Sequence, residues 1–258
     1  MIDTHCHLDF KDFDSNRDEV LTEARDAGIH TIVNIGADLA SSIRGVELSE
    51  SHDMVYATVG IHPHDAATLD DASLQKLREL SFRKKVVAIG EIGLDYYRDL
   101  SPRPIQRTAF ERQIQLAIDR KLPIVIHTRE SFDDTYAIVK GYAKDLVGGV
   151  FHCFPGTADD AFRVSDLGFV ISVGGVITYN KSSMAAMAAE VPLEKIILET
   201  DAPYLTPVPF RGKTNKPSYV RYVCAKLAEL QNRSEQEVER VTDANAKRLY
   251  RLSETFEG

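Results

Sequence analysis

Short apolar runs recur along the whole chain, and longer segments of mixed polarity separate each run from the next. The runs are rich in Val and Ile, which is typical of buried strands. We predict eight strands on this basis, at Ile2–His7, Thr31–Ile35, Val55–Val59, Val86–Glu91, Ile124–His127, Val150–His152, Phe169–Val173 and Ile196–Asp201.

Several of the intervening segments carry apolar residues at helical spacing, and each of the others is long enough to hold a helix. The predicted helices are Arg17–Ala27, Leu74–Phe82, Arg107–Arg120 and Ala158–Leu167, with Tyr219–Leu230 and Glu235–Tyr250 closing the chain. Strands that alternate with helices pair in parallel through right-handed crossovers. Eight such units predict an α/β fold of the TIM (β/α)8 barrel type. No linker or repeat divides the sequence, so we expect a single domain over residues 1–258.

Composition narrows the class of protein. Hydrophobic residues make up 43% of the 258 positions and charged residues 27%, which is ordinary for a globular enzyme. The net charge of −8 argues against a broad basic surface that coats nucleic acid. A nucleic-acid substrate remains compatible with this charge, because cations bound at a site supply positive charge locally.

Cysteine usage and apolar run lengths indicate the compartment. The three cysteines, Cys6, Cys153 and Cys224, form no Cys-x-x-Cys pair, which favours a reducing cytoplasm. No apolar stretch approaches the ~20 residues that a membrane helix needs. Strand-like sequence starts at Ile2 without a basic leader, so we expect no signal peptide and no membrane association.

Potential metal ligands stand at the ends of five predicted strands. They are His5 and His7, Glu91, His127, His152 and Asp201. Catalytic sites of TIM barrels form at these carboxyl ends. Any one of the six has an ordinary alternative: a lone histidine is often just a hydrogen-bonded polar group, and Asp201 could cap a turn. Their joint occurrence predicts a centre for divalent cations such as zinc or manganese.

Motifs around these residues resemble the TatD family of metal-dependent hydrolases. The resemblance rests on His5-Cys6-His7-Leu8, Gly90-Glu91-Ile92-Gly93-Leu94-Asp95-Tyr96-Tyr97, Ile126-His127-Thr128-Arg129-Glu130, His152-Cys153-Phe154-Pro155-Gly156 and Glu199-Thr200-Asp201-Ala202-Pro203-Tyr204-Leu205. It covers nearly the whole chain, in the order and spacing of the family. It implies an amidohydrolase-type barrel and metal-dependent DNase activity, often exonucleolytic from 3′ to 5′. By the same resemblance the six residues hold two metal ions, with Glu91 shared between them.

We therefore expect a deoxyribonuclease that removes nucleotides from the 3′ end of single-stranded DNA, with RNA as a further substrate. Two divalent ions, magnesium, manganese or zinc, would bridge a hydroxide that attacks phosphorus. Asp201 would orient the hydroxide and take its proton. Because imidazoles bind metal only when neutral, activity should collapse below roughly pH 6. The sequence suggests no obligate protein partner.

Residues near the strand ends have predicted supporting roles. The resemblance implies that His62 contacts a substrate phosphate, whereas His64 reads as an ordinary loop residue. Arg129 could grip a phosphate oxygen or form a surface salt bridge. Asp3, Glu199 and Asp95 could orient the ligands, but they could also pair with buried cations or cap a turn.

The loop Pro207–Pro217 is locally basic and is the predicted nucleic-acid contact. Arg211 and Lys213 could neutralise phosphates, and Asn215 belongs to the same predicted contact. Unpaired bases could stack on an aromatic ring, for which the sequence offers Tyr96, Tyr97, Tyr204 and Phe210. Lys216 stands where the family tends to have an acidic residue.

Two other functions fit the same sequence. The site could hydrolyse an ester or amide, as in a D-aminoacyl-tRNA deacylase, because a fold does not fix its substrate. A binding protein with a structural metal is the second alternative. Six ligands exceed the four that a closed structural site uses, which disfavours that reading.

Overall fold

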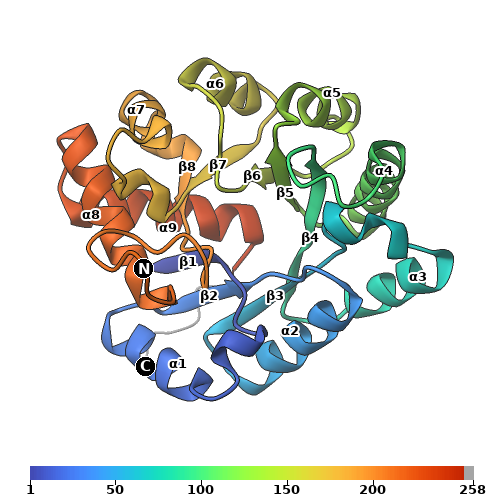
Figure 1. Ribbon diagram of the computed structural model, residues 1–258, viewed down its shortest axis with the longest axis horizontal. Helices are drawn as coiled ribbons and strands as arrows, with labels where there is room; N and C mark the ends of the chain where they lie inside the picture. Colours follow the sequence, from blue (N-terminus) through green and yellow to red (C-terminus); the bar gives the residue numbers. More distant parts are fainter. Residues whose placement is uncertain (253–258) are drawn as a thin grey trace.

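Eight parallel strands, hydrogen-bonded in the order of the chain, form one sheet in the computed structural model, which describes residues 1–252. Each strand pairs with the next in sequence, as Figure 1 shows. The strands are β1 Ile2–Cys6, β2 Thr31–Asn34, β3 Val55–Val59, β4 Val86–Asp95, β5 Ile124–Arg129, β6 Gly149–Phe151, β7 Val170–Val173 and β8 Ile196–Leu198.

The sheet is closed where the end of β1 meets the segment after β8. Cys6 forms a parallel bridge with Ala202. The amide of Asp201 donates to the carbonyl of His5 at 2.9 Å, and the amide of His7 donates to the carbonyl of Ala202 at 2.8 Å. The predicted TIM barrel is therefore confirmed, and its closure holds Asp201 beside both histidines of β1.

Helices surround the sheet on the outside (Figure 1). They are α1 Arg17–Asp26, α2 Leu39–Ser51, α3 Asp71–Leu80, α4 Arg103–Arg120, α5 Phe132–Tyr142, α6 Ala158–Asp166, α7 Ser183–Glu190, α8 Val220–Gln231 and α9 Glu235–Tyr250. Short 3-10 turns are η1 Lys11–Phe13, η2 Pro63–Thr68, η3 Gly175–Thr178, η4 Leu193–Lys195 and η5 Pro217–Tyr219. Within residues 1–252, none of the helices has the length and apolar character to cross a membrane.

Local sequence explains where the helices begin. Asp70 accepts the backbone N–H of Ser73 while the Ser73 hydroxyl accepts that of Asp70, a reciprocal cap that starts α3. Thr157 and Asp160 form the same arrangement at α6. Helix α2 was harder to predict, because the face that it buries consists largely of serine and glycine together with Val46, so the apolar period is weak.

The strand ends differ most from the sequence prediction in β4 and β8. Strand β4 extends to Asp95, beyond the predicted end at Glu91, because its pairing with β5 continues from Ile92 to Asp95. Gly93 permits this pairing: its φ is +143°, and a Cβ atom there would lie 2.0 Å from the carbonyl oxygen of His127. Strand β8 ends at Leu198, so that Glu199 and Asp201 lie on the connection that follows it.

The core has two parts. The larger one packs strands against the surrounding helices and includes buried phenylalanines such as Phe110 and Phe151. A smaller cluster joins Val33, Val125 and Ile197 from the strands to Tyr250 of α9. Burial of these apolar side chains stabilises the barrel and makes it rigid. The rigid strands hold the polar residues at their ends in place.

Candidate metal centre at the carboxyl ends of the strands

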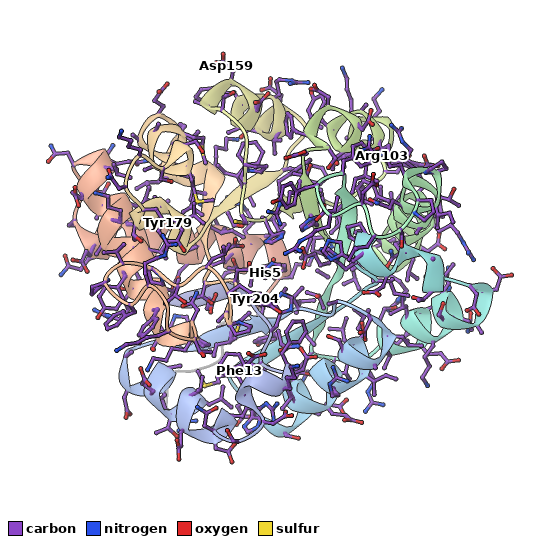
Figure 2. All side chains as sticks on the ribbon, in the orientation of Figure 1. His5, Phe13, Arg103, Asp159, Tyr179 and Tyr204 are labelled. Carbon is purple, nitrogen blue, oxygen red and sulfur yellow. The ribbon has the colours of Figure 1, made fainter. Side chains whose placement is uncertain are left out.

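The six residues proposed from sequence as ligands converge on one place in the structure. His5 and His7 come from the end of β1, Glu91 from β4 and His127 from β5, while His152 and Asp201 follow β6 and β8. In the view of Figure 2, His5 lies within the ring of strands. All of the predicted strand ends with a ligand-type side chain therefore contribute to a single cluster.

Glu91 lies at the middle of this cluster and turns its two oxygens toward different partners. Its Oε1 is 2.8 Å from Nδ1 of His127 and 2.8 Å from Nε2 of His152. Its Oε2 is 3.5 Å from Nε2 of His5 and 4.0 Å from Nε2 of His7. Only 3% of this residue is exposed, so its charge is compensated by these rings.

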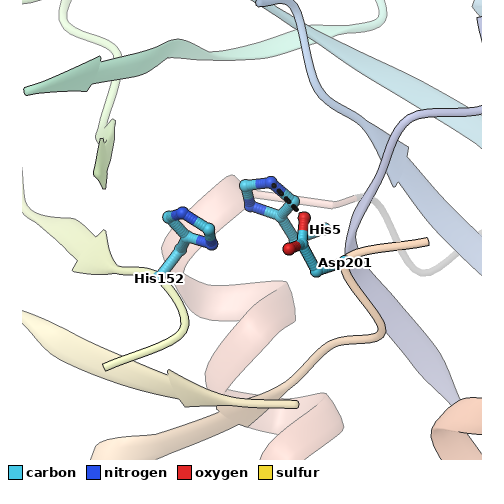
Figure 3. Close-up of side chains that lie close together, drawn as sticks. All are labelled: His5, His152 and Asp201. Atoms are coloured by element: carbon cyan, nitrogen blue, oxygen red, sulfur yellow. Dashed lines mark ion pairs between the residues drawn. The ribbon is translucent and has the colours of Figure 1, made fainter. Parts of the chain in front are cut away.

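Asp201 completes the group around Oε2. Its Oδ1 is 3.6 Å from Nε2 of His5 and 3.5 Å from Nε2 of His7, and the two ring nitrogens are 3.3 Å apart. Figure 3 shows the Asp201 carboxylate facing His5, with His152 on the other side of that ring. We call His5, His7, Asp201 and the Oε2 atom the first half of the site.

The group around Oε1 is joined by direct hydrogen bonds. His127 bonds to Glu91 through Nδ1 and to Oδ2 of Asp95 through Nε2, at 2.8 and 3.0 Å. The same Asp95 oxygen is 2.9 Å from Nε2 of His64, a residue that sequence analysis assigned to an ordinary loop. We call His127, His152 and the Oε1 atom the second half of the site.

Neighbouring groups fix the orientation of the rings. Nδ1 of His7 is 3.1 Å from the carbonyl oxygen of Ile35, which can only accept, so Nδ1 carries a proton and, in the neutral ring, Nε2 has the lone pair. Glu199 lies 3.6 Å from Nδ1 of His152 and 3.9 Å from Nδ1 of His5. Within residues 1–252, these two buried Nδ1 atoms have no hydrogen-bond partner.

The charges of the cluster perturb one another strongly. Burial pushes the pKa of Glu91 upward, but His152, His62 and His127 outweigh it and hold that pKa well below its usual value. Burial lowers the pKa of His152, yet Glu91 and Glu199 raise it well above its usual value. The pKa of His5 is lowered, by burial and then by His152.

The first half has the spacing expected around a cation. Two ligands about 2.1 Å from one ion, at tetrahedral or octahedral angles, lie roughly 3.0–3.4 Å from each other. The neighbouring donor atoms of His5, His7, Asp201 and Glu91 are 3.3 to 4.0 Å apart. Buried imidazole nitrogens that point at one another without a hydrogen-bonded carboxylate between them fit a divalent ion.

Three further residues were predicted to act near the ligands, and two of them, His62 and Asp3, lie beside ligand residues. Nε2 of His62 is 3.5 Å from Oε1 of Glu91, so His62 itself belongs to a possible ligand group with Glu91 and His127. Asp3 is fully buried and accepts from the amide and the hydroxyl of Thr200, at 2.9 and 2.6 Å. Arg129 is exposed, and its guanidinium lies 3.8 Å from the centre of the Tyr97 ring.

The loop Pro207–Pro217 has exposed basic residues and a buried asparagine, which make different contacts. Arg211 and Lys213 are exposed and lie over the rings of Tyr179 and Phe210. Asn215 is fully buried, and its amide nitrogen donates to the carbonyls of Thr200 and Tyr204 at 2.8 and 2.6 Å. Asn215 therefore anchors the loop to the segment that carries Asp201, and substrate contact by its side chain stays a prediction.

Sequence reasoning missed several contributors. His64 contacts Asp95 at 2.9 Å, and Ser172 contacts Glu199 at 2.5 Å. Phe10 stacks on His7 with 4.5 Å between ring centres. The spacing of His7 and Phe10 along the chain was the only local signal for that contact, and it is not specific.

The chain matches the family described as TatD related DNase over residues 2–251. It belongs to the TatD family. It is 41% identical over 254 residues to the uncharacterized metal-dependent hydrolase YabD of Bacillus subtilis, covering 98% of this chain and all of that protein. It is 32% identical to the 3′-5′ ssDNA/RNA exonuclease TatD of Cronobacter sakazakii, with 97% of each chain covered.

A solved structure agrees with this assignment. The TatD homologue YJJV of Escherichia coli superimposes with a TM-score of 0.93 at 33% identity, covering 98% of both chains. The family resemblance noted from the motifs is confirmed, as is the expectation of a metal-dependent hydrolase. The TatD-family barrel places its strand-end cluster where such an enzyme needs its reactive groups.

Proposed function

We propose that this TatD-family hydrolase is a DNase that removes nucleotides from the 3′ end of single-stranded DNA, with RNA as a further substrate. The relative from Cronobacter sakazakii named for that activity supports the choice of substrate. The observation that carries the proposal is the Glu91 carboxylate, whose two oxygens face different histidines, Oε2 toward His5 and Oε1 toward His127 and His152.

Two divalent ions, magnesium, manganese or zinc, would be held by these residues. His5, His7 and Asp201 with one oxygen of Glu91 would hold the first, and the other oxygen with His127 and His152 the second. When bound, such ions act as Lewis acids on a phosphodiester and lower the pKa of coordinated water. The remaining work of catalysis falls to the side chains.

Asp201 is the residue proposed to orient the attacking water and take its proton. Burial raises its pKa, but His7, His5 and His152 lower it by more. The pKa is therefore below its usual value, and the carboxylate is ionised at neutral pH. Its side chain is 14% exposed, against 4% for Glu91, so it lies nearer to the solvent from which water and substrate arrive. The water oxygen joins phosphorus, the P–O bond to the leaving group breaks, and the leaving oxygen becomes a hydroxyl by taking up the proton that Asp201 received.

Cationic groups at the rim are the proposed phosphate contacts. Arg211 and Lys213 are exposed on the connection after β8, Arg129 is exposed at the end of β5, and His62 lies at the base of the site. These contacts would position a polyanion without reading its sequence. Asp3, Glu199 and Asp95 are proposed to hold the ligand residues in place through the bonds described above.

The test is a timed digestion of end-labelled single-stranded DNA by metal-stripped protein, with magnesium, manganese or zinc restored. The proposal expects a ladder that shortens from the 3′ end only after metal is added. Intact DNA with every metal, from protein shown to bind two ions, would contradict it. Aminoacyl esters would then be the next substrates to test.

A further inference from the structure

An aromatic pair lies directly against the first half of the site. The ring of Phe10 stacks on His7, with 4.5 Å between centres and 20° between planes. Tyr204 lies edge-on to Phe10 at 6.3 Å and to His7 at 6.5 Å. Tyr204 is 52% exposed and Phe10 is partly exposed, so both rings are accessible beside a proposed metal ligand.

Backbone contacts hold the pair in place. The amide of Phe10 donates to the carbonyl of His7 at 3.1 Å, and the amide of Tyr204 donates to the carbonyl of Asp201 at 2.8 Å. Asn215 donates to the carbonyl of Tyr204 at 2.6 Å. Two of these tethers end on proposed ligands, so the backbone that carries the rings keeps a fixed place relative to the reactive groups.

Phe10 has His7 on one face, and the other aromatic residues at the rim likewise have a partner on one face. Arg103 covers Tyr96 at 4.2 Å, Arg129 covers Tyr97 at 3.8 Å, and Tyr219 stacks on Phe210 at 4.4 Å. In the described part of the chain, Tyr204 has only edge contacts with rings and no cation over its face. It is therefore the ring best placed to accept another flat group.

Charge favours the same side of the barrel mouth. A cavity of about 900 Å³ between α5, α6 and α7 is lined by Glu130, Asp133, Asp134, Asp160 and Glu190. Arg107 pairs with Asp134, and Arg163 pairs with Asp133 and Asp160, but the carboxylates outnumber these two arginines, so the cavity wall still repels a phosphate chain. The connection after β8, which carries Tyr204, also presents the exposed Arg211 and Lys213. A polyanion is thus drawn toward Tyr204 and away from the acidic cavity.

We propose that Phe10 and Tyr204 form the seat for the unpaired base of the nucleotide whose phosphodiester is cleaved. The assignment rests on the proposed nuclease function and adds the part of the substrate that it recognises. Stacking uses a face that every base has, so the seat selects for unpaired strands and not for sequence. In a duplex the neighbouring base pairs cover those faces.

The direct test assays each protein variant on two different substrates. Tyr204→Leu removes the flat ring, Tyr204→Phe restores it, and Phe82→Leu removes a ring that is 65% exposed on the α3–β4 connection, away from the ligand residues. Each is assayed on an oligodeoxynucleotide with a normal 3′ base and on one with an abasic 3′ terminus. Base stacking on an aromatic side chain corresponds to roughly a 5- to 150-fold change in affinity.

We expect Tyr204→Leu to raise KM at least about 5-fold on the normal oligonucleotide and to change it little on the abasic one. Tyr204→Phe and Phe82→Leu should behave as the wild type. A loss of equal size on both substrates would overturn the seat, because a purely structural role of Tyr204 does not depend on the base. Phe10→Leu provides a second variant with the same expected pattern.

A binding measurement separates this inference from the nuclease proposal. Metal-stripped protein is mixed with a short oligonucleotide that carries 2-aminopurine at its 3′ end, whose fluorescence is quenched by stacking. The chain contains no tryptophan, so the probe is excited selectively. Quenching that is lost in Tyr204→Leu supports the seat even if the wild type cleaves no DNA. Equal quenching, or none in either protein, would overturn it.

Discussion

The two halves of the site are built differently around one carboxylate. In the first half, the ring nitrogens of His5 and His7 keep distances of 3.3 to 4.0 Å from each other, from Asp201 and from Oε2 of Glu91. In the second half, His127 and His152 bond directly to Oε1 at 2.8 Å. The first half is therefore open for an ion, whereas an ion in the second half must displace hydrogen bonds.

This difference implies an order of binding. The first half should take up an ion with little rearrangement, because barrel closure already places Asp201 beside the two histidines of β1. The second half should bind more weakly, since the proton shared with Glu91 must leave first. The following predictions test this contrast, from the largest expected effect to the smallest.

Glu91→Gln should abolish DNA cleavage at any metal concentration. The amide keeps the shape of the side chain but removes the negative charge that both halves share. Without that charge, buried histidine rings are costly to keep beside a cation. The measurement is the initial rate on single-stranded DNA. Glu111→Gln, an exposed glutamate of α4, is the matched control and should be unaffected. A Glu91→Gln enzyme with a tenth of wild-type activity would refute the shared role.

Asp201→Asn should lower kcat on the order of 10²- to 10⁴-fold, the usual contribution of a general base. The assay is run at saturating metal, so that weaker ion binding in the first half is compensated. Full turnover by this variant would remove Asp201 from proton transfer. It would also show that the open half serves only to hold an ion.

Asp95→Asn should affect the second half alone. Asp95 bonds to Nε2 of His127 and touches no residue of the first half within the described chain. Loss of such an orienting carboxylate typically weakens metal binding about 10- to 100-fold. Calorimetric titration should show a weaker second ion and an unchanged first one. Equal weakening of both ions would show that the halves are not separate.

The pH dependence of ion binding should also differ between the halves. The pKa of His127 is lowered by burial but raised overall by Asp95 and Glu91, and that of His152 is raised well above its usual value. A raised histidine pKa means that the proton stays bound to higher pH, so ion affinity in the second half falls as pH falls through that range. His5, with its lowered pKa, is already neutral in that pH range.

Calorimetry in two buffers of different ionisation enthalpy counts the protons released at each step. We expect more protons to leave with the second ion than with the first at neutral pH. The first step is not free of protons, because Asp201 raises the pKa of His7 against the effect of burial. Equal release in the two steps would contradict the contrast drawn from the hydrogen bonds.

Much of this architecture could be predicted from sequence because strand geometry is periodic. Side chains two apart along β1 share a face, so His5 and His7 were expected on one side. Parallel strands put their carboxyl ends at one edge, which gathers Glu91, His127, His152 and Asp201. Their assembly in one cluster is observed, and their service as metal ligands remains our proposal.

Other features have no local signature. The direction of each Glu91 oxygen depends on rings from β1, β5 and β6 that meet only in the closed barrel. The contact of Asp95 with His64 joins β4 to η2, and no spacing in the sequence predicts it. Helix α7 was missed because its alanines and methionines give little contrast between its faces.

The most direct test of the account is a count of bound ions by native mass spectrometry during a manganese titration of metal-stripped protein. The account predicts two ions per wild-type chain, taken up in separate steps. It predicts one ion in His127→Ala, where only the second half is broken, and none in Glu91→Ala. A wild type that stops at one ion, or a Glu91→Ala protein that still binds two, would contradict it.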